Sequence, residues 1–326
     1  MSNRLAAVMV AVAVGLAGCG GSGSEAEPAS PAPSTPRPAE SAQPGRPAQP
    51  GPTQPGVALP AADVVIPADP ARAADTLKRT SAALDRAIDE WRGADDTDGA
   101  DDTDGAGMKE PPEPVVLLAL HQQRIYRVLA RRPDLARRTI ARLPEPLAAQ
   151  ARDNVAATRA LFSLTRPVKK ANIFRTRQPL PAATLLGYMR QAQRRFDVSW
   201  QVLAAVMHVE TKFGRIKSAS SAGAQGPMQF LPSTWKAYGL GGDIHDPRDA
   251  ILGAANYLQA SGAPGDYERA LFAYNHDRRY VDAVQRYARQ MRRDARTYYA
   301  YYTWQVFVLT TRGDVRLTGP SPLPRF

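Results

Sequence analysis

The chain has 326 residues, of which 44% are hydrophobic, and its 42 lysine and arginine residues exceed its 31 aspartate and glutamate residues to give a formal charge of +11. Such an excess of positive charge attracts anionic partners, and nucleic acid is the usual candidate. The only cysteine is Cys19, which excludes an intramolecular disulfide.

The first 19 residues predict a secretion signal. Arg4 precedes an apolar run, residues 5–14, that is too short to span a bilayer as a mature helix. The run leads to Leu16-Ala17-Gly18-Cys19, which resembles a bacterial lipobox, where the cysteine is acylated and becomes the mature N-terminus. We expect residues 1–19 to be a lipoprotein signal peptide and the lipid on Cys19 to anchor the protein at the outer face of the membrane. The alternative is a plain signal peptide with a chance cysteine.

Residues 20–72 are dominated by proline, alanine, serine, glycine and glutamine. A segment of this composition buries too little apolar surface to offset its ordering entropy. We expect a disordered, extended tether that gives an anchored domain its reach.

A helical extension is predicted over residues 73–180. Apolar residues recur at helical spacing in four segments, which prolines separate: 73–92, 115–131, 135–141 and 147–164. An acidic loop, residues 93–107, repeats the sequence Gly-Ala-Asp-Asp-Thr-Asp. It does not fit an EF-hand, because alanine stands in place of the first aspartate and no glutamate closes the loop. We expect a solvated loop, and an extension that packs against the next domain.

Glu210 is the candidate catalytic residue. It lies in a helical pattern over residues 199–213, and Leu203, Val206 and Phe213 share its face. A lone carboxyl group on an apolar stripe is desolvated, so its pKa rises, as a general acid requires at neutral pH. The alternative is a structural glutamate paired with Lys212 or Arg215.

Two further blocks follow Glu210. The small, flexible segment 218–226 leads into Met228-Gln229, and its glycines at 223 and 226 allow positive φ and a close approach to a ligand. Later comes Tyr274-Asn275, where an aromatic ring beside an amide suits a sugar face and an N-acetyl group. Taken singly, the blocks fit an ordinary interhelical loop and a half-buried tyrosine at a helix end better than they fit a binding site.

In this order, the three blocks resemble the catalytic core of lytic murein transglycosylases, which are lysozyme-like enzymes that cleave peptidoglycan. The resemblance covers roughly residues 185–289, and its details look like those of secreted actinobacterial lipoproteins. It implies that Glu210 protonates the bond between N-acetylmuramic acid and N-acetylglucosamine, then acts as base while the muramyl 6-hydroxyl attacks, which leaves a 1,6-anhydro end. It also implies substrate-binding roles for Ser220, Gln229, Tyr274 and Asn275.

One departure from the family pattern keeps a second function open. Relatives often carry serine two residues after the Tyr-Asn pair, where this chain has Asp277. A muramidase that hydrolyses the same bond would need a second carboxylate to activate water, and Asp277 is the best candidate. A non-catalytic peptidoglycan-binding lipoprotein is the third alternative, but it predicts loss of Glu210 or of Met228-Gln229.

The remaining expectations concern the chain end, metals and charge. The lysozyme-like domain is assigned to residues 181–292. The C-terminal aromatic segment, residues 293–326, is rich in aromatic and β-branched residues up to Leu309, and a turn over residues 310–314 predicts a short hairpin. The fold class is thus mainly α, with the extension before the catalytic domain. No cofactor or metal is expected, and the positive charge should meet an anionic wall and anionic lipid rather than nucleic acid.

Overall fold

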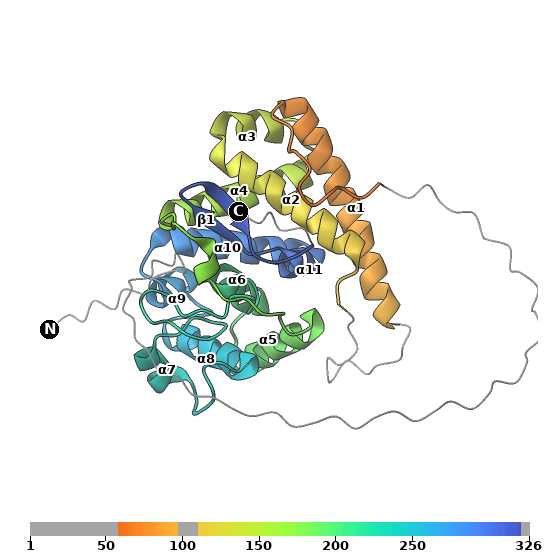
Figure 1. Cartoon of the computed structure of the whole chain (residues 1–326). Coiled ribbons are helices and arrows are strands. Elements are labelled where there is room, and N and C mark those ends of the chain that lie inside the picture. The colour runs from red at the N-terminus through yellow and green to blue at the C-terminus, as the bar shows by residue number, and fades with distance from the viewer. Residues whose placement is uncertain (1–57, 97–109, 321–326) are drawn as a thin grey trace, which may run out of the picture. The chain divides into compact units, whose positions relative to one another are not determined.

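The computed structural model describes residues 58–96 and 110–320, and the chain there is mainly helical (Figure 1). The helices are α1 (Pro70–Asp96), α2 (Glu113–Arg131), α3 (Pro133–Ile140), α4 (Glu145–Leu164), α5 (Ala182–Phe196), α6 (Trp200–Thr211), α7 (Pro232–Tyr238), α8 (Pro247–Ala260), α9 (Tyr267–Tyr274), α10 (Arg278–Arg293) and α11 (Arg296–Thr303), with a single 3-10 turn at Ala171–Ile173. Strands β1 (Phe307–Thr310) and β2 (Gly313–Arg316) pair antiparallel. The predicted fold class, including the hairpin, is confirmed. The predicted signal peptide, with Cys19, lies outside the described residues.

Proline and aspartate set several helix starts. Pro133, Pro232 and Pro247 each occupy the first position of a helix, where the missing N–H group needs no partner. Asp246 caps α8, because its Oδ1 accepts the backbone N–H groups of residues 248 and 249 at 2.9 and 3.0 Å. Proline and the aspartate cap therefore fix where α7 and α8 begin.

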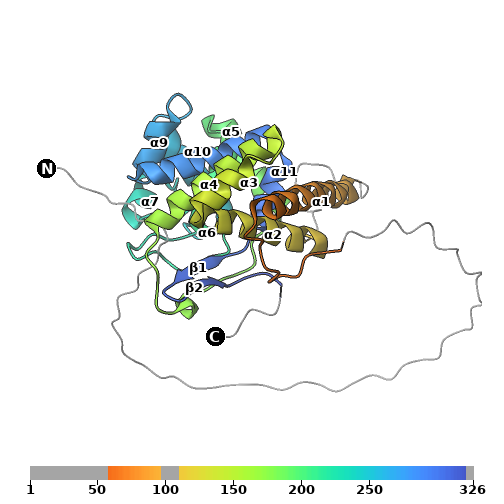
Figure 2. The same ribbon diagram turned by 90° about the horizontal axis from the view of Figure 1, so that it is seen from above.

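The extension packs on the following helices rather than standing apart. In both views α1 and α2 lie at one side of the helices and α7 and α9 at the other, with α4, α6 and α10 between them (Figures 1 and 2). Contacts run from α1 to α2, from α2 to α4, from α4 to α10, and from α10 to α6. The helix that carries Glu210 is therefore connected through α10 to the extension.

A buried carboxylate, Asp153 of α4, fastens the extension to α10. Arg286 and Arg289 donate to its Oδ1 at 2.9 and 2.6 Å, and the Gln290 amide donates to Oδ2. Burial by itself would raise the pKa of Asp153, but the hydrogen bonds from Arg289 and Gln290 outweigh it and keep the pKa below the ordinary value. Asp153 is thus an ionised clamp between the two parts.

The C-terminal hairpin is pinned to α2. The Gln123 side chain exchanges two hydrogen bonds of 2.9 Å with the backbone of Gln305, just before β1. Asp314 on β2 accepts from Arg127 at 3.0 Å and from Arg131 at 2.6 Å. These hydrogen bonds and ion pairs therefore join the C-terminal hairpin to α2, although the two are distant in sequence.

Two predicted boundaries are wrong. The tether was expected to reach residue 72, but Ile66 is buried, Arg124 donates to the carbonyl groups of residues 62 and 63, and α1 begins at Pro70. The acidic loop was expected from residue 93, but α1 continues to Asp96, and the rest of that loop lies outside the described residues.

The C-terminal aromatic segment, assigned to residues 293–326, is not strand throughout. Helix α11 comes first, and strand begins only at Phe307. Tyr298, Tyr301 and Trp304 are buried there, because helical spacing aims them at the core. These aromatic residues therefore belong to the core, and no helix in the two described ranges is both long and apolar enough to cross a membrane.

Candidate functional site

Glu210 lies in the last turn of α6, a helix buried along almost its whole length. Its residue exposure is only 5%, and residues 203–207 of the same helix are completely buried. The helix ends where Lys212 and Phe213 turn to φ values of 52° and 59°, which takes the chain sharply away after the carboxyl group. The predicted position on an apolar stripe is what the structure has.

Burial dominates the electrostatics of Glu210. It raises the pKa of the carboxyl group from 4.5 to about 7, while the Tyr280 hydroxyl and the positive charge of Lys212 act in the opposite direction. The Tyr280 hydroxyl is buried near the carboxyl group and has no hydrogen-bond partner in the described part of the chain. No salt bridge joins Glu210 to Lys212 or to Arg215, whose Nη1 donates to the carbonyl of Tyr302 at 2.6 Å. At neutral pH a large fraction of Glu210 therefore carries its proton.

The Met-Gln block is held against the end of α6. Thr211, next to Glu210, donates its hydroxyl hydrogen to the carbonyl of Pro227 at 2.6 Å and accepts the N–H of Gly214 at 2.9 Å. Backbone bonds between residues 225 and 230, at 2.8 and 2.9 Å, close the loop that contains Met228. The side chain of Thr211 thus fixes this loop relative to the carboxyl group.

Tyr274 joins the same loop from the end of α9. Its hydroxyl donates to the carbonyl of Met228 at 2.6 Å, and its pKa is raised far above 10.0 by burial and by the nearby Glu210 charge. The structure therefore brings together Glu210, the Met-Gln loop and Tyr274. Asn275 is buried beside it, and its N–H closes the helix on Leu271 at 2.9 Å.

Gln229 carries an unused hydrogen-bond acceptor. The residue is buried, adopts a φ of 52°, and donates through Nε2 to the carbonyl of Gly226 at 3.0 Å. Its Oε1 is buried and has no hydrogen-bond partner among the described residues. An unpaired buried carbonyl oxygen costs free energy unless a ligand supplies a donor, so Gln229 can receive a sugar hydroxyl or amide N–H.

Ser220 shapes its loop through its hydroxyl oxygen and its backbone N–H. Its Oγ accepts the N–H of Ala224 at 3.0 Å, and its N–H donates to the carbonyl of the same residue at 2.9 Å. Gly223 and Gly226 have φ values of 81° and 74°, as predicted. At Gly226 a side chain would lie 1.9 Å from the carbonyl oxygen of Ile244, so the close approach it permits is to backbone.

Asp277 is occupied as a helix cap. Its Oδ1 accepts the Arg279 N–H at 2.8 Å, and the Arg279 guanidinium pairs with Oδ2 at 2.6 Å. These bonds from Arg279 lower the pKa of Asp277. Both carboxylate oxygens are thus committed to a neighbour on α10, which argues against a role in activating water.

A second wall of the site was not anticipated from the sequence. A cavity of about 120 Å³ includes Glu210 and Lys212 and is closed by α2, α4, the segment after α4 and the hairpin. Its lining also includes Arg127, Arg166, Phe162 and residues 305–309. Nothing local in the sequence signals this wall, because it depends on contacts between segments far apart in the chain.

Two further buried residues, His208 of α6 and Tyr280 of α10, surround the helix that carries Glu210. His208 is fully buried among Phe213, Tyr287, Tyr301 and Trp304, with ring centroids 4.8–5.7 Å away. Burial lowers the pKa of His208 well below its ordinary value, so the neutral ring packs among these aromatic rings. The influence of Tyr280 on Glu210 was missed, since it comes from α10.

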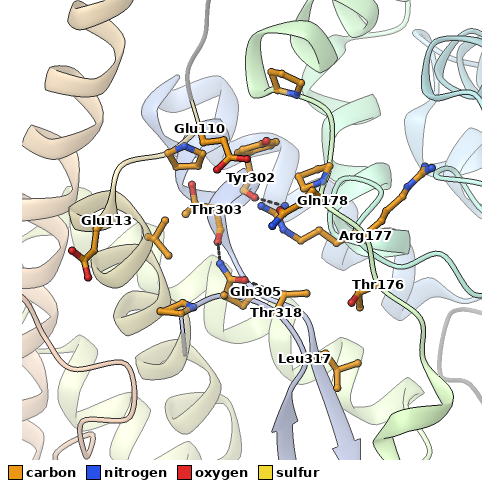
Figure 3. A pocket seen from close by; sticks show the side chains of 17 residues that line it. Glu110, Glu113, Thr176, Arg177, Gln178, Tyr302, Thr303, Gln305, Leu317 and Thr318 are labelled. Carbon is orange, nitrogen blue, oxygen red and sulfur yellow. Dashed lines mark hydrogen bonds between the residues drawn. The ribbon is translucent and has the colours of Figure 1, made fainter. Parts of the chain in front are cut away.

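A larger cavity of about 800 Å³ lies elsewhere and contains none of the predicted site residues. Figure 3 shows its labelled lining, in which Gln305 is linked to Thr303 and Thr318 by bonds of 2.6 and 2.8 Å. Its polar groups are thus partly satisfied by one another. Within residues 58–96 and 110–320, no three His, Cys, Asp or Glu side chains gather to hold a metal ion.

Comparison with known families identifies the central part of the chain. Residues 187–296 match the family described as the transglycosylase SLT domain. The match begins within α5 and ends at the first residue of α11, so it includes Glu210, the Met-Gln loop and the Tyr274-Asn275 pair. No solved structure matches the chain. The extension α1–α4 and the hairpin lie outside the matched residues.

Proposed function

We propose that this chain, whose residues 187–296 belong to the transglycosylase SLT family, cleaves the bond between N-acetylmuramic acid and N-acetylglucosamine with Glu210 as its single acid–base catalyst. The family is one of lysozyme-like lytic transglycosylases that act on peptidoglycan, so the substrate is a glycan strand outside the cytoplasm. The observation that carries the proposal is the buried carboxyl group of Glu210, whose pKa is raised to about 7.

The first step is protonation of the leaving group. Neutral Glu210 donates its proton to the glycosidic oxygen as the bond to the muramyl anomeric carbon breaks. Burial keeps enough of the carboxyl group protonated at neutral pH for this transfer. The unpaired Oε1 of Gln229 and the fixed loop around Met228 supply polar contacts that orient the sugar.

In the second step the same residue acts as the base. The Glu210 carboxylate accepts the proton of the muramyl 6-hydroxyl, whose oxygen attacks the anomeric carbon of the same sugar. The 1,6-anhydro bond forms and Glu210 regains its proton, so no water is consumed. The nucleophile is already part of the substrate, and proximity removes the need for a second carboxylate. The commitment of Asp277 to Arg279 is consistent with this scheme.

The parts of the chain divide accordingly. Residues 1–19 are proposed to be a lipoprotein signal, with Cys19 lipidated, and the following Pro-rich segment to be the tether. The helical extension and the hairpin then support a catalytic domain at the membrane surface. Digestion of purified sacculi followed by mass spectrometry of the muropeptides tests the reaction, because anhydro and reducing ends differ by one water.

A further inference from the structure

The cavity beside Glu210 has an unusual charge balance. Three cationic side chains line it, those of Arg127, Arg166 and Lys212, against one carboxyl group, Glu210 itself. Burial raises the pKa of Glu210 to about 7 and lowers the pKa of Lys212 to about 7, so both charges are partial at neutral pH, and the excess of cationic side chains comes from the two arginines. The cavity is therefore built to receive negative charge from outside the chain.

Arg127 is not free to supply this attraction. Its guanidinium pairs with Asp314 at 2.8 Å and lies between the rings of Phe162 and Phe307, 4.9 and 4.4 Å from their centroids. Arg127 thus has a counterion and a fixed position. Its function is to hold the hairpin against α2 as one wall of the cavity.

Lys212 is one of two cations lining the cavity without a carboxylate partner in the two described ranges of the chain, and unlike the exposed Arg166 it is partly buried. Its Nζ donates to the carbonyl of His208 at 2.7 Å, and no salt bridge joins it to a carboxylate in the described part of the chain. An ammonium group has three N–H donors, so two are left over beside a cavity that Lys212 itself lines. Burial lowers the pKa of Lys212, and an anion beside it would restore the charged form.

The size of the cavity limits the anion. The cavity has a volume of about 120 Å³. A three-carbon substituent that ends in a carboxylate fits this space. Among the groups on a peptidoglycan strand, the lactyl ether of N-acetylmuramic acid has this chemistry when no peptide is attached to it.

We infer that Lys212 binds the free lactyl carboxylate of a muramyl residue, and that the enzyme therefore prefers glycan strands from which the peptides have been removed. The inference rests on the proposed function for its substrate class. Attachment of a peptide converts this carboxylate to an amide and removes the charge that Lys212 recognises. A reaction that releases the peptide from the lactyl group must then supply the preferred substrate.

The test compares three forms of the same strands: peptide-bearing, amidase-treated with free lactyl carboxylates, and amidase-treated strands whose carboxylates have been converted to methylamides. Wild-type kcat/KM should be about tenfold higher on the free carboxylate than on the methylamide, since a charge-assisted hydrogen bond is lost. In Lys212→Met this ratio should fall to about one. Lys217→Met, which removes an exposed lysine outside the cavity, should keep the wild-type ratio.

Binding gives a readout that does not depend on turnover. Glu210→Gln should bind free-carboxylate strands about tenfold more tightly than methylamidated strands, and the double variant with Lys212→Met should bind both equally. Equal binding of the two strands by Glu210→Gln, or an unchanged preference after Lys212→Met, would overturn the inference. Products without anhydro ends would refute the proposed reaction and leave this binding test intact.

Discussion

The raised pKa of Glu210 makes the stability of the protein depend on pH, and Glu210→Gln should remove that dependence. The folded protein binds the proton of Glu210 more tightly than the unfolded chain does, because burial disfavours the carboxylate. The stabilisation is complete below the unfolded pKa of 4.5 and is lost as pH rises through about 7. Glutamine resembles the protonated form at every pH, so the variant does not lose this stabilisation as the pH rises.

The size of the effect follows from the shift. A rise from 4.5 to about 7 corresponds to about 3 kcal/mol at roughly 1.4 kcal/mol per pKa unit, so Glu210→Gln should be about 2–3 kcal/mol more stable at pH 8, relative to wild type, than it is at pH 5. Taking the difference between the two proteins cancels the other titrating groups, apart from their coupling to Glu210.

The assay is urea unfolding of both proteins at pH 5 and pH 8, followed by tryptophan fluorescence. Glu268→Gln, which makes the same chemical change at an exposed position on α9, is the matched control and should follow the wild type. A difference between Glu210→Gln and wild type that stays the same at both pH values would refute the account of burial at Glu210.

Three further changes test other parts of the molecule. Asp153→Ala should lower the free energy of unfolding by about 1.5–3 kcal/mol, because it removes the carboxylate that accepts charge-assisted hydrogen bonds from the partly exposed arginines of α10; a loss below about 1 kcal/mol in urea unfolding would contradict the clamp. Asp277→Asn should change the rate of sacculus digestion only a few-fold, since Asp277 caps α10, and abolished activity would favour a hydrolase. Cys19→Ser should prevent incorporation of labelled fatty acid and release the protein from membranes, whereas a wild type that incorporates no lipid would rule out the lipobox.

Local pattern explains which features were predictable. The helical spacing around Glu210 and the positive φ at Gly223 depend on neighbours within one turn or loop. The tail was harder, because its aromatic run favours strand by composition while packing makes Tyr298 and Tyr301 helical. Core contacts outweighed local preference there.

The far wall of the site could not be predicted for a different reason. Arg127 and Phe307 are separated by most of the chain, and they come together only because Asp314 and Gln305 pin the hairpin to α2. The environment of Lys212 depends on the same contacts between the hairpin and α2. From the sequence, Lys212 is one candidate ion-pair partner for Glu210. In the structure the two residues line the same cavity without forming a salt bridge.

The most direct measurement of the central claim is digestion of sacculi in heavy-oxygen water by wild type and by Glu210→Gln, with mass spectrometry of the muropeptides. The wild type should yield anhydromuramyl ends without solvent oxygen. A folded Glu210→Gln should yield them at least about 10²-fold more slowly, because it can neither donate nor accept the proton. Heavy oxygen at the new muramyl ends, or most of the activity retained in Glu210→Gln, would contradict the account.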